Sequence, residues 1–272
     1  MKVWVLGTGS SGNAILLESG TTRLLVDVGF GPRTLARRMK LAGVDAASVV
    51  ACIITHDHSD HAGGAARAAG RWGWQIFATA GTASAADFGE LPVNTFAPGD
   101  RVRVGSLEIE TVATPHDAVE PVSLVATAIE SGARAAICYD VGHASDSVRA
   151  LCDSVDVLVL EANHDEGMLW AGPYPPWLCQ RIAGKLGHLS NRAAAAVARD
   201  AVTPQLAHVV LAHLSEQNNS PELAHRTVRA ALRKTAFRGR LSTSHQDAVA
   251  GPFTPRGFTS RSTPPVQLSF AL

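Results

Sequence analysis

Short apolar runs separated by turn-forming residues recur along the chain, and this pattern predicts many short strands. We expect strands at residues 3–6, 14–18, 23–27, 50–54, 75–78, 101–104, 107–113, 122–130, 133–138, 155–161 and 207–212. Gly105-Ser106 and Ser131-Gly132 separate consecutive runs in the middle of the chain, as turns do in β-hairpins.

Apolar residues at helical spacing predict helices at residues 32–42, 62–70, 191–200 and 221–235. Pro32 and Gly43 are residue types typical of a helix start and a helix end. Ser190 is expected to cap the alanine-rich helix that follows it. Because strands and helices interleave through both halves, the predicted class is α/β, an αββα sandwich of two mixed sheets flanked by helices.

The 272 residues provide ample chain for a core, and we expect a single domain over residues 1–250. Residues 251–272 are rich in Pro, Ser, Thr and Arg. This tail is expected to be irregular until a final edge strand at residues 266–270. The composition, 46% hydrophobic and 18% charged, is that of an ordinary globular protein.

The formal net charge is zero, so any contact with nucleic acid must be local. Arg226, Arg229 and Arg233 share one stripe of a predicted helix, which indicates a solvated face or, as the alternative, a track for a phosphate backbone. No apolar run approaches the roughly eighteen residues of a membrane span, and the N-terminal run is too short for a signal peptide. The four cysteines form no C-x-x-C pair, so we expect reduced thiols in a cytoplasmic protein.

The segment from Gly7 to Asn13 has the G-x-G-x-x-G spacing of dinucleotide-binding loops. That function requires a helix directly after the glycines, because the pyrophosphate lies at the helix N-terminus. Two apolar runs around Gly20-Thr21 follow instead and predict a hairpin. We therefore do not expect a dinucleotide cofactor.

The strongest chemical signal is the H-x-H-x-D-H motif of His56, His58, Asp60 and His61, between an apolar strand and a predicted helix. In an extended chain the first two histidines project to the same side, and the other two residues can face a second point as the chain turns. Burying several imidazoles and a carboxylate is unfavourable unless something coordinates them. Nitrogen and oxygen ligands suit Zn²⁺, Mn²⁺ or Fe, whereas the alternative is a solvated histidine-rich loop.

This motif resembles the signature of the metallo-β-lactamase fold superfamily, and further motifs follow in the family's order along nearly the whole chain. Thr114-Pro115-His116-Asp117 stands where the family has its third histidine. Asp140 stands where the family has a metal-bridging aspartate, and His213 where it has its final ligand.

The resemblance implies two divalent metal ions per chain. One ion would be held by His56, His58 and His116, the other by Asp60, His61 and His213, and Asp140 would bridge both. Antibiotic-hydrolysing members of this fold lack a histidine at the position of His61 and have a cysteine in place of Asp140, so these residues disfavour that activity.

Later segments refine the resemblance. Gly187-His188-Leu189-Ser190-Asn191 and Ala212-His213-Leu214-Ser215, with Glu161 upstream, resemble late motifs of the tRNase Z group. His188 is not needed as a ligand, because the seven residues above fill both metal sites, and a purely structural histidine is the alternative to the role that the resemblance implies. By that resemblance, His188 would pair with Glu161 and act at the scissile phosphate, either stabilising charge or protonating the leaving oxygen.

Other segments resemble the YycJ/WalJ (VicX) family of metal-dependent DNA exonucleases more specifically: residues 7–14 and 161–169, Gly172-Pro173-Tyr174-Pro175, and residues 213–219. This resemblance spans about residues 3–250. It implies a dinuclear phosphodiesterase that removes nucleotides from DNA with a metal-bridging hydroxide.

In this fold, residues 7–13 would form an active-site loop. Three side chains of this loop can donate hydrogen bonds to phosphate oxygens: Ser10, Ser11 and Asn13. We also expect Ser190 to bind the substrate. A plain turn between two strands is the alternative. Asp27 would orient the metal-binding loop without binding a metal itself.

Two other functions stay open at this point. One is a metallohydrolase for a small thioester or lactone, although the short tail does not resemble the helical substrate domain of glyoxalase-type enzymes. The other is a metal-stabilised scaffold that serves in signalling without catalysis. The intact ligand set disfavours a scaffold, because a scaffold need not retain an open water site. The expected partner is therefore DNA, and no membrane is involved.

Overall fold

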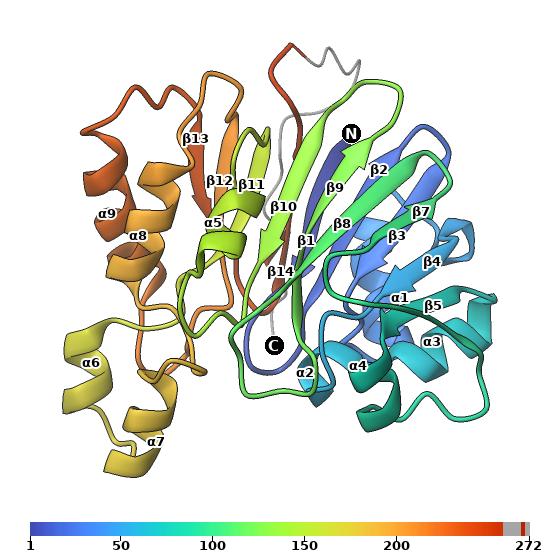
Figure 1. Ribbon diagram of the computed structural model, residues 1–272, viewed down its shortest axis with the longest axis horizontal. Helices are drawn as coiled ribbons and strands as arrows, with labels where there is room; N and C mark the ends of the chain where they lie inside the picture. Colours follow the sequence, from blue (N-terminus) through green and yellow to red (C-terminus); the bar gives the residue numbers. More distant parts are fainter. Residues whose placement is uncertain (258–267, 270–272) are drawn as a thin grey trace.

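The computed structural model describes residues 1–257 and 268–269. Within these residues the strands form two sheets that face each other, and helices cover the outer faces (Figure 1). This arrangement confirms the predicted αββα class.

The first sheet has eight strands among the described residues and is mixed. Strands β14, β1, β2 and β3 pair antiparallel, whereas β3, β4, β5 and β6 pair parallel. In spatial order the strands are β15 (Leu268–Ser269), β14 (Ala248–Phe253), β1 (Lys2–Gly7), β2 (Ala14–Ser19), β3 (Thr22–Val26), β4 (Ala51–Ile53), β5 (Gln75–Thr79) and β6 (Val93–Phe96).

The second sheet has seven strands among the described residues and is also mixed. Strands β7 to β10 form an antiparallel meander, and β10 to β13 pair parallel. In spatial order the strands are β13 (Arg240–Thr243), β12 (His208–Ala212), β11 (Val157–Glu161), β10 (Arg134–Cys138), β9 (Val122–Ala128), β8 (Leu107–Ala113) and β7 (Arg101–Val104).

Helices flank the sheets on both sides, and two short helices extend from the body at one end (Figure 1). Those beside the first sheet are α1 (Pro32–Leu41), α2 (Ser59–Ala62), α3 (Ala65–Trp72) and α4 (Ala80–Ala85), with a 3-10 turn at Ala46–Ser48. Those beside the second sheet are α5 (Asp146–Leu151), α8 (Asn191–Asp200) and α9 (Pro221–Leu232). The extending helices are α6 (Glu166–Ala171) and α7 (Pro176–Ile182).

Three apolar cores hold these layers together. Along β1, Val3 and Val5 pack between the sheets, whereas Trp4 and Leu6 pack under the helices of the first sheet. This is the two-residue alternation of a strand, and both faces are apolar because both are covered. The third core lies between the second sheet and helices α5, α8 and α9.

Most predicted elements are present within a few residues of their expected bounds. Residues 62–70 are an exception, because the structure has two helices there, interrupted at Gly63 and Gly64. A Cβ atom on Gly64 would lie 2.0 Å from the carbonyl oxygen of Phe30, so the chain approaches closely at this point.

The C-terminal region differs in part from the expectation. Strand β14 continues through residues 251–253, so the chain is still regular where an irregular tail was expected to begin. The strand expected at residues 266–270 lies mostly outside the described residues, but β15 falls within it and pairs with β14 at the sheet edge. The single domain over residues 1–250 stays a prediction.

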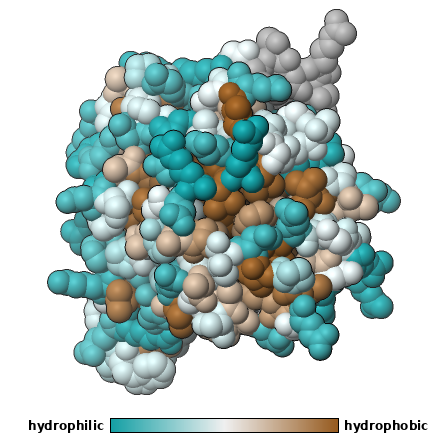
Figure 2. Space-filling view, turned by 45° about the vertical axis from the view of Figure 1, so that its right-hand side comes forward, coloured by the Kyte–Doolittle hydropathy of each residue, from teal (hydrophilic) through white to brown (hydrophobic). Residues whose placement is uncertain are grey.

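The surface mixes hydrophobic and hydrophilic residues. On the face in Figure 2, hydrophobic residues gather in the middle of the view and hydrophilic residues surround them. In the described residues, no helix has the length and apolar character needed to cross a membrane.

Candidate metal centre

Four of the predicted site residues lie at the ends of strands that meet at one edge of the second sheet, and the residues of the H-x-H-x-D-H motif follow β4 of the first sheet. His116 follows β8, Asp140 follows β10, His213 follows β12, and Glu161 ends β11. These strands run in the same direction, so their carboxyl ends share an edge. Asp140 and His213 have positive φ angles of 53° and 52°. Non-glycine residues rarely adopt this conformation, which recurs at functional sites.

Three histidines form the first ligand group: His56, His58 and His116 each offer a ring nitrogen within 4.8 Å of the others. On their outer sides, His116 Nδ1 lies 3.1 Å from the Gly187 carbonyl oxygen and His58 Nε2 lies 3.2 Å from that of Asp117. A carbonyl only accepts hydrogen bonds, so these nitrogens donate. The lone pairs therefore belong to His116 Nε2 and His58 Nδ1, which are 3.3 Å apart.

The same reasoning applies to His56. The hydroxyl of Thr55 donates to Asp27 Oδ2 at 2.8 Å, so it accepts from His56 Nδ1 at 3.0 Å. The lone pair of His56 is then on Nε2, which is buried without a hydrogen-bond partner. All three histidines thus present unprotonated nitrogens to a common region, and a cation satisfies such an arrangement.

The second ligand group consists of Asp60, His61 and His213, which also meet within 4.8 Å. His61 Nδ1 donates to Asp27 Oδ2 at 2.6 Å, so Nε2 is the nitrogen of this ring that would bind a metal ion. His213 Nε2 lies 3.5 Å from Asp60 Oδ2 and is likewise buried without a hydrogen-bond partner.

Asp140 lies between the two groups. Its Oδ2 atom is 3.7 Å from His56 Nε2 and 2.5 Å from His61 Nε2, and its Oδ1 atom is 3.0 Å from His213 Nδ1. Neither oxygen has a hydrogen bond of good geometry. Burial favours the neutral acid, but His213 and His61 outweigh it and hold the pKa of Asp140 well below its usual range. This set of imidazoles and carboxylates fits divalent transition-metal ions.

His188 and Glu161 form a pair next to Asp140. His188 Nδ1 lies 2.7 Å from Glu161 Oε1 and 3.1 Å from Asp140 Oδ1. Glu161 Oε2 accepts hydrogen bonds from the backbone N–H groups of Val141 and Leu189, at 2.8 and 3.0 Å. Together with Asp140 and His213, these two residues lie close enough to one another to hold a metal ion. Their hydrogen bonds to each other and to the backbone already use both Glu161 oxygens.

The electrostatics of this pair favour a charged imidazole. Burial lowers the pKa of His188, but the Glu161 and Asp140 carboxylates outweigh it and raise the pKa to about 9. Burial raises the pKa of Glu161, and His188 outweighs it and lowers that pKa to about 2. His188 also lines the cleft, so a charged imidazole stands beside the space where a ligand would bind.

Asp27 lies beneath the centre and is fully buried. Its Oδ2 atom contacts His61 Nδ1 and accepts from the Tyr139 hydroxyl at 2.7 Å, and its Oδ1 atom accepts from the Thr55 backbone at 2.7 Å. These contacts orient His61 and, through Thr55, His56. They are the contacts that the predicted orienting role requires.

The loop residues that were predicted to donate hydrogen bonds to phosphate lie partly at the surface and partly in the interior. Ser10 lines the cleft, and Ser11 is exposed beside it. Asn13, in contrast, is fully buried, and its Oδ1 accepts from Gly9 and Thr8. Its Nδ2 atom contacts Asp60 Oδ2 at 3.2 Å and His61 Nε2 at 2.9 Å. In this structure the Asn13 amide therefore contacts two candidate ligands, and the phosphate contact expected of it stays a prediction.

Ser190 also takes part in local hydrogen bonds. It caps α8, as predicted, by accepting from the Ala193 backbone at 3.2 Å. The same hydroxyl donates to Glu166 Oε1 at 3.0 Å, and the residue is buried. The hydroxyl thus already donates one hydrogen bond and accepts another, and the expected contact between Ser190 and substrate stays a prediction.

The cleft over the centre has a volume of about 270 Å³. Besides the expected residues, Tyr174, Leu178 and Arg181 of the α6–α7 region line it. Arg181 Nε lies 2.5 Å from Asp117 Oδ2 and joins this region to the loop after β8. Sequence reasoning missed these residues, although the Gly172-Pro173-Tyr174-Pro175 motif marked the segment.

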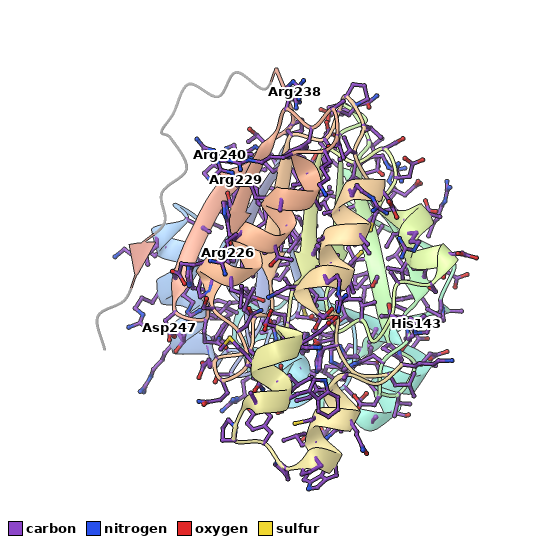
Figure 3. The ribbon with its side chains drawn as sticks, turned by 90° about the vertical axis from the view of Figure 1, so that its left-hand side faces the viewer. His143, Arg226, Arg229, Arg238, Arg240 and Asp247 are labelled. Carbon is purple, nitrogen blue, oxygen red and sulfur yellow. The ribbon has the colours of Figure 1, made fainter. Side chains whose placement is uncertain are left out.

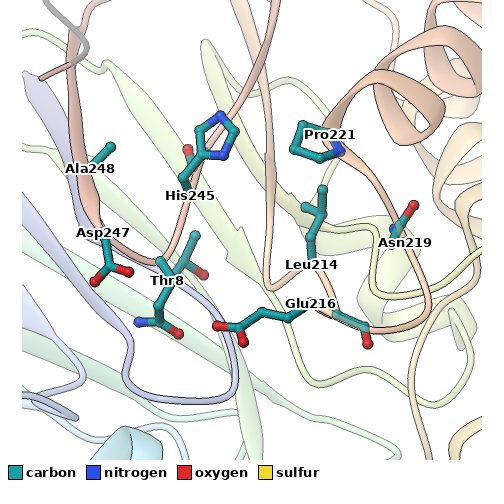
Figure 4. A pocket seen from close by; sticks show the side chains of 11 residues that line it. Thr8, Leu214, Glu216, Asn219, Pro221, His245, Asp247 and Ala248 are labelled. Carbon is teal, nitrogen blue, oxygen red and sulfur yellow. The ribbon is translucent and has the colours of Figure 1, made fainter. Parts of the chain in front are cut away.

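A second pocket, of about 410 Å³, lies on the other side of Thr8 (Figure 4). Glu216, His245 and Asp247 are among the polar residues around it. Thr8 also lines this pocket, and its hydroxyl accepts from the His213 backbone at 3.0 Å and donates to Asn13 at 2.8 Å.

The arginines on α9 are exposed. Figure 3 shows Arg226 and Arg229 on the same side of the molecule as Arg238 and Arg240 near β13. Arg233 caps the C-terminus of α9 and is also exposed. Exposure is compatible with a solvated face and with a phosphate track, so both interpretations stay open.

Comparison with known proteins identifies the family. The model of the beta-lactamase superfamily domain matches residues 22–214. The chain is 32% identical over 238 residues to the exodeoxyribonuclease YycJ of Bacillus anthracis, covering 86% of this chain and 89% of that protein. It is 32% identical over 234 residues to the exodeoxyribonuclease WalJ of Streptococcus pneumoniae serotype 2 strain D39, covering 84% and 86%.

Solved structures agree on the fold. The metallo-β-lactamase fold protein YhfI from Bacillus subtilis matches with a TM-score of 0.66 at 19% identity, over 91% of this chain and 98% of YhfI. The resemblance inferred from the sequence motifs is thus confirmed. With its histidine and aspartate groups at the edge of the sheets, the chain belongs to the beta-lactamase superfamily and is a metallo-β-lactamase-fold hydrolase.

Proposed function

We propose that this hydrolase is a dinuclear phosphodiesterase, an exonuclease that acts on DNA. The observation that carries the proposal is the position of Asp140 between two ligand groups, with His188 beside it in the cleft. His56, His58 and His116 would hold one divalent ion and Asp60, His61 and His213 the other, with Asp140 shared. The ions would be Zn²⁺, Mn²⁺ or Fe.

When bound, such ions bring the pKa of water towards about 7 and neutralise charge that develops on phosphate oxygens. The protein's own groups would do the rest. His188 would donate its proton to the leaving oxygen, and Glu161 would orient the ring and favour its charged form. Ser10 would hold a phosphate oxygen at the rim of the cleft.

Two observations support DNA as substrate and the cytoplasm as location. YycJ and WalJ, which are both named exodeoxyribonucleases, match this chain over more than four fifths of its length. All four cysteines are buried free thiols, as is usual in a reducing compartment.

The test is hydrolysis by the purified protein in a panel of divalent metals, with end-labelled DNA, RNA, a simple phosphodiester and a thioester assayed side by side. We expect metal-dependent shortening of DNA from one end, stopped by a chelator and absent in Asp140→Ala. Turnover of the thioester with inert nucleic acids would contradict the proposal, as would faster cleavage of RNA than of DNA.

A further inference from the structure

The segment from α6 to the loop after α7 carries exposed aromatic surface. Trp170 is 57% exposed and Trp177 is 64% exposed, and Leu186 nearby is 54% exposed. The two short helices extend from the body below α8 (Figure 1). We call residues 166–187 the arm. Large apolar side chains that gather in solvent on one element usually mark an interaction surface.

The arm is continuous with the catalytic cleft. Two residues close to the tryptophans in sequence line the cleft itself. Tyr174 lies between Trp170 and Trp177, and Leu178 directly follows Trp177. The arm ends at Gly187, whose carbonyl oxygen contacts His116 Nδ1 at 3.1 Å. The backbone N–H of Asp117 also donates to the Leu186 carbonyl at 3.0 Å. A polymeric substrate that extends from the metal centre on this side would therefore contact the arm.

The arm is also internally fixed. The Cys179 thiol of α7 donates to the Leu169 carbonyl of α6 at 3.3 Å and contacts the Tyr174 carbonyl at 3.6 Å. These contacts join the helix that carries Trp170 to the helix that carries Trp177. The aromatic side chains therefore stand on a packed support.

The charge of the arm indicates which kind of partner it binds. Residues 166–187 contain two cationic residues, Arg181 and Lys185, and one acidic residue, Glu166, whose carboxylate pairs with Arg192 outside the arm. Both cationic residues are exposed, and Arg181 also pairs with Asp117. Exposed aromatic rings beside positive charge bind single-stranded nucleic acids, because bases stack on the rings and phosphates pair with the cations.

We propose that the arm is a stacking platform for unpaired bases of single-stranded DNA, with Trp170 and Trp177 as the stacking residues and Arg181 and Lys185 beside the backbone. This inference rests on the proposed function, since it places the strand that leaves the scissile phosphate. It also specifies the substrate: a DNA strand is held by its unpaired bases, so a base-paired end must open before it binds.

The platform can be tested by binding, separately from catalysis. Two of the protein's five tryptophans are in the arm, so a short single-stranded oligodeoxynucleotide should quench the intrinsic fluorescence. Phosphorothioate linkages make this probe resistant to hydrolysis. We expect Trp170→Ala/Trp177→Ala to lose the quenching and to bind about tenfold or more weakly. Trp72→Ala is the matched control on α3, across the molecule from the arm (Figure 1).

A strand with abasic sites has the same backbone charge but no bases to stack. The wild-type protein should bind it as weakly as the double variant binds the normal strand. Trp170→Phe/Trp177→Phe should retain part of the affinity, which separates stacking from misfolding. Duplex DNA of the same sequence should bind more weakly than the single strand.

Several outcomes would overturn the platform. These are unchanged affinity in the double variant, equal binding of the abasic strand, tighter binding of duplex DNA, or tighter binding of RNA of the same sequence. A wild-type dimer that the double variant turns into a monomer with full DNA affinity would assign the surface to a second copy. Failure of the proposed function looks different, since the wild-type protein would then bind the probe with quenching but hydrolyse no nucleic acid.

Discussion

The imidazole of His188 and the carboxylate of Glu161 lie 2.7 Å apart, next to the metal centre but outside its ligand groups. In His188→Ala the ligand groups remain complete. The variant should therefore keep its metals and melting temperature but lose about 10²–10⁴-fold in hydrolysis rate, the usual scale for a general acid. Elemental analysis, thermal unfolding and single-turnover rates check this. His225→Ala on α9 is the control, and a fully active or metal-free His188→Ala would refute the assignment.

Glu161→Gln tests the partner. An amide has only one acceptor oxygen, whereas Glu161 accepts from His188 and from two backbone N–H groups, one of them on Val141 next to Asp140. We expect a lower rate and a lower pKa for His188, measured by NMR on the metal-free protein. Glu166→Gln, which changes a carboxylate paired with Arg192, should leave both quantities unchanged. A wild-type pKa for His188 in Glu161→Gln would remove Glu161 from this role.

Asp140 is predicted to serve both ions. Native protein should hold close to two metal ions per chain, and Asp140→Ala should lose more than one of them, because this carboxylate lies against residues of both ligand groups. Elemental analysis after gentle purification is the measurement. Glu216→Gln, at the pocket beyond Thr8, should retain the wild-type metal content. Retention of both ions by Asp140→Ala would show that this carboxylate does not bridge them.

The sequence predicted which candidate ligands lie close together, because each of them has a local signature. His56, His58 and His61 stand in one short motif, and His116, Asp140 and His213 each follow an apolar strand. The carboxyl ends of parallel strands lie at one edge of a sheet, so the closeness of these residues could be predicted from the sequence. The layers were predictable for the same reason, since apolar strands buried on both faces need cover on both sides.

Side-chain direction in loops was not predictable. Gly9 and Gly12 have φ angles of 146° and 152°, and the loop they shape turns the Asn13 amide inwards against Asp60. Sequence gives no such information at glycines. The α6 and α7 helices were also missed, because each is short and Gly172, Pro173 and Pro175 interrupt any helical period.

Asp27 tests how far the buried network supports the metals. Asp27→Asn should weaken metal affinity about 10–100-fold, because the amide is a poorer acceptor for the His61 N–H group. Tyr139→Phe removes only one hydrogen bond to the same carboxylate, so it should cost about 1–2 kcal/mol of stability with a smaller effect on the metals. Competition with a fluorescent chelator measures the affinity. Equal metal affinity in Asp27→Asn and wild type would contradict the orienting role.

His208 should make stability depend on pH at a point remote from the metals. Its ring packs 5.4 Å from that of Phe253, and burial together with Arg240 lowers the pKa of His208 to about 4. The usual value is about 6.5. Between these values the unfolded chain binds a proton that the folded protein does not, so this contribution is complete above about pH 6.5 and is lost as the pH falls towards 4.

Urea unfolding of chelator-treated protein across this interval checks the sign. Other buried groups, among them His56 and His116, whose pKa burial also lowers, contribute to the pH dependence as well. The informative quantity is therefore the difference between wild type and His208→Gln, in which the other groups cancel. The variant should lose less free energy of unfolding on acidification than the wild type does. If both proteins lose the same free energy of unfolding, the pKa of His208 is the same in the folded protein as in the unfolded chain. The packing of His208 against Phe253 then has no electrostatic consequence.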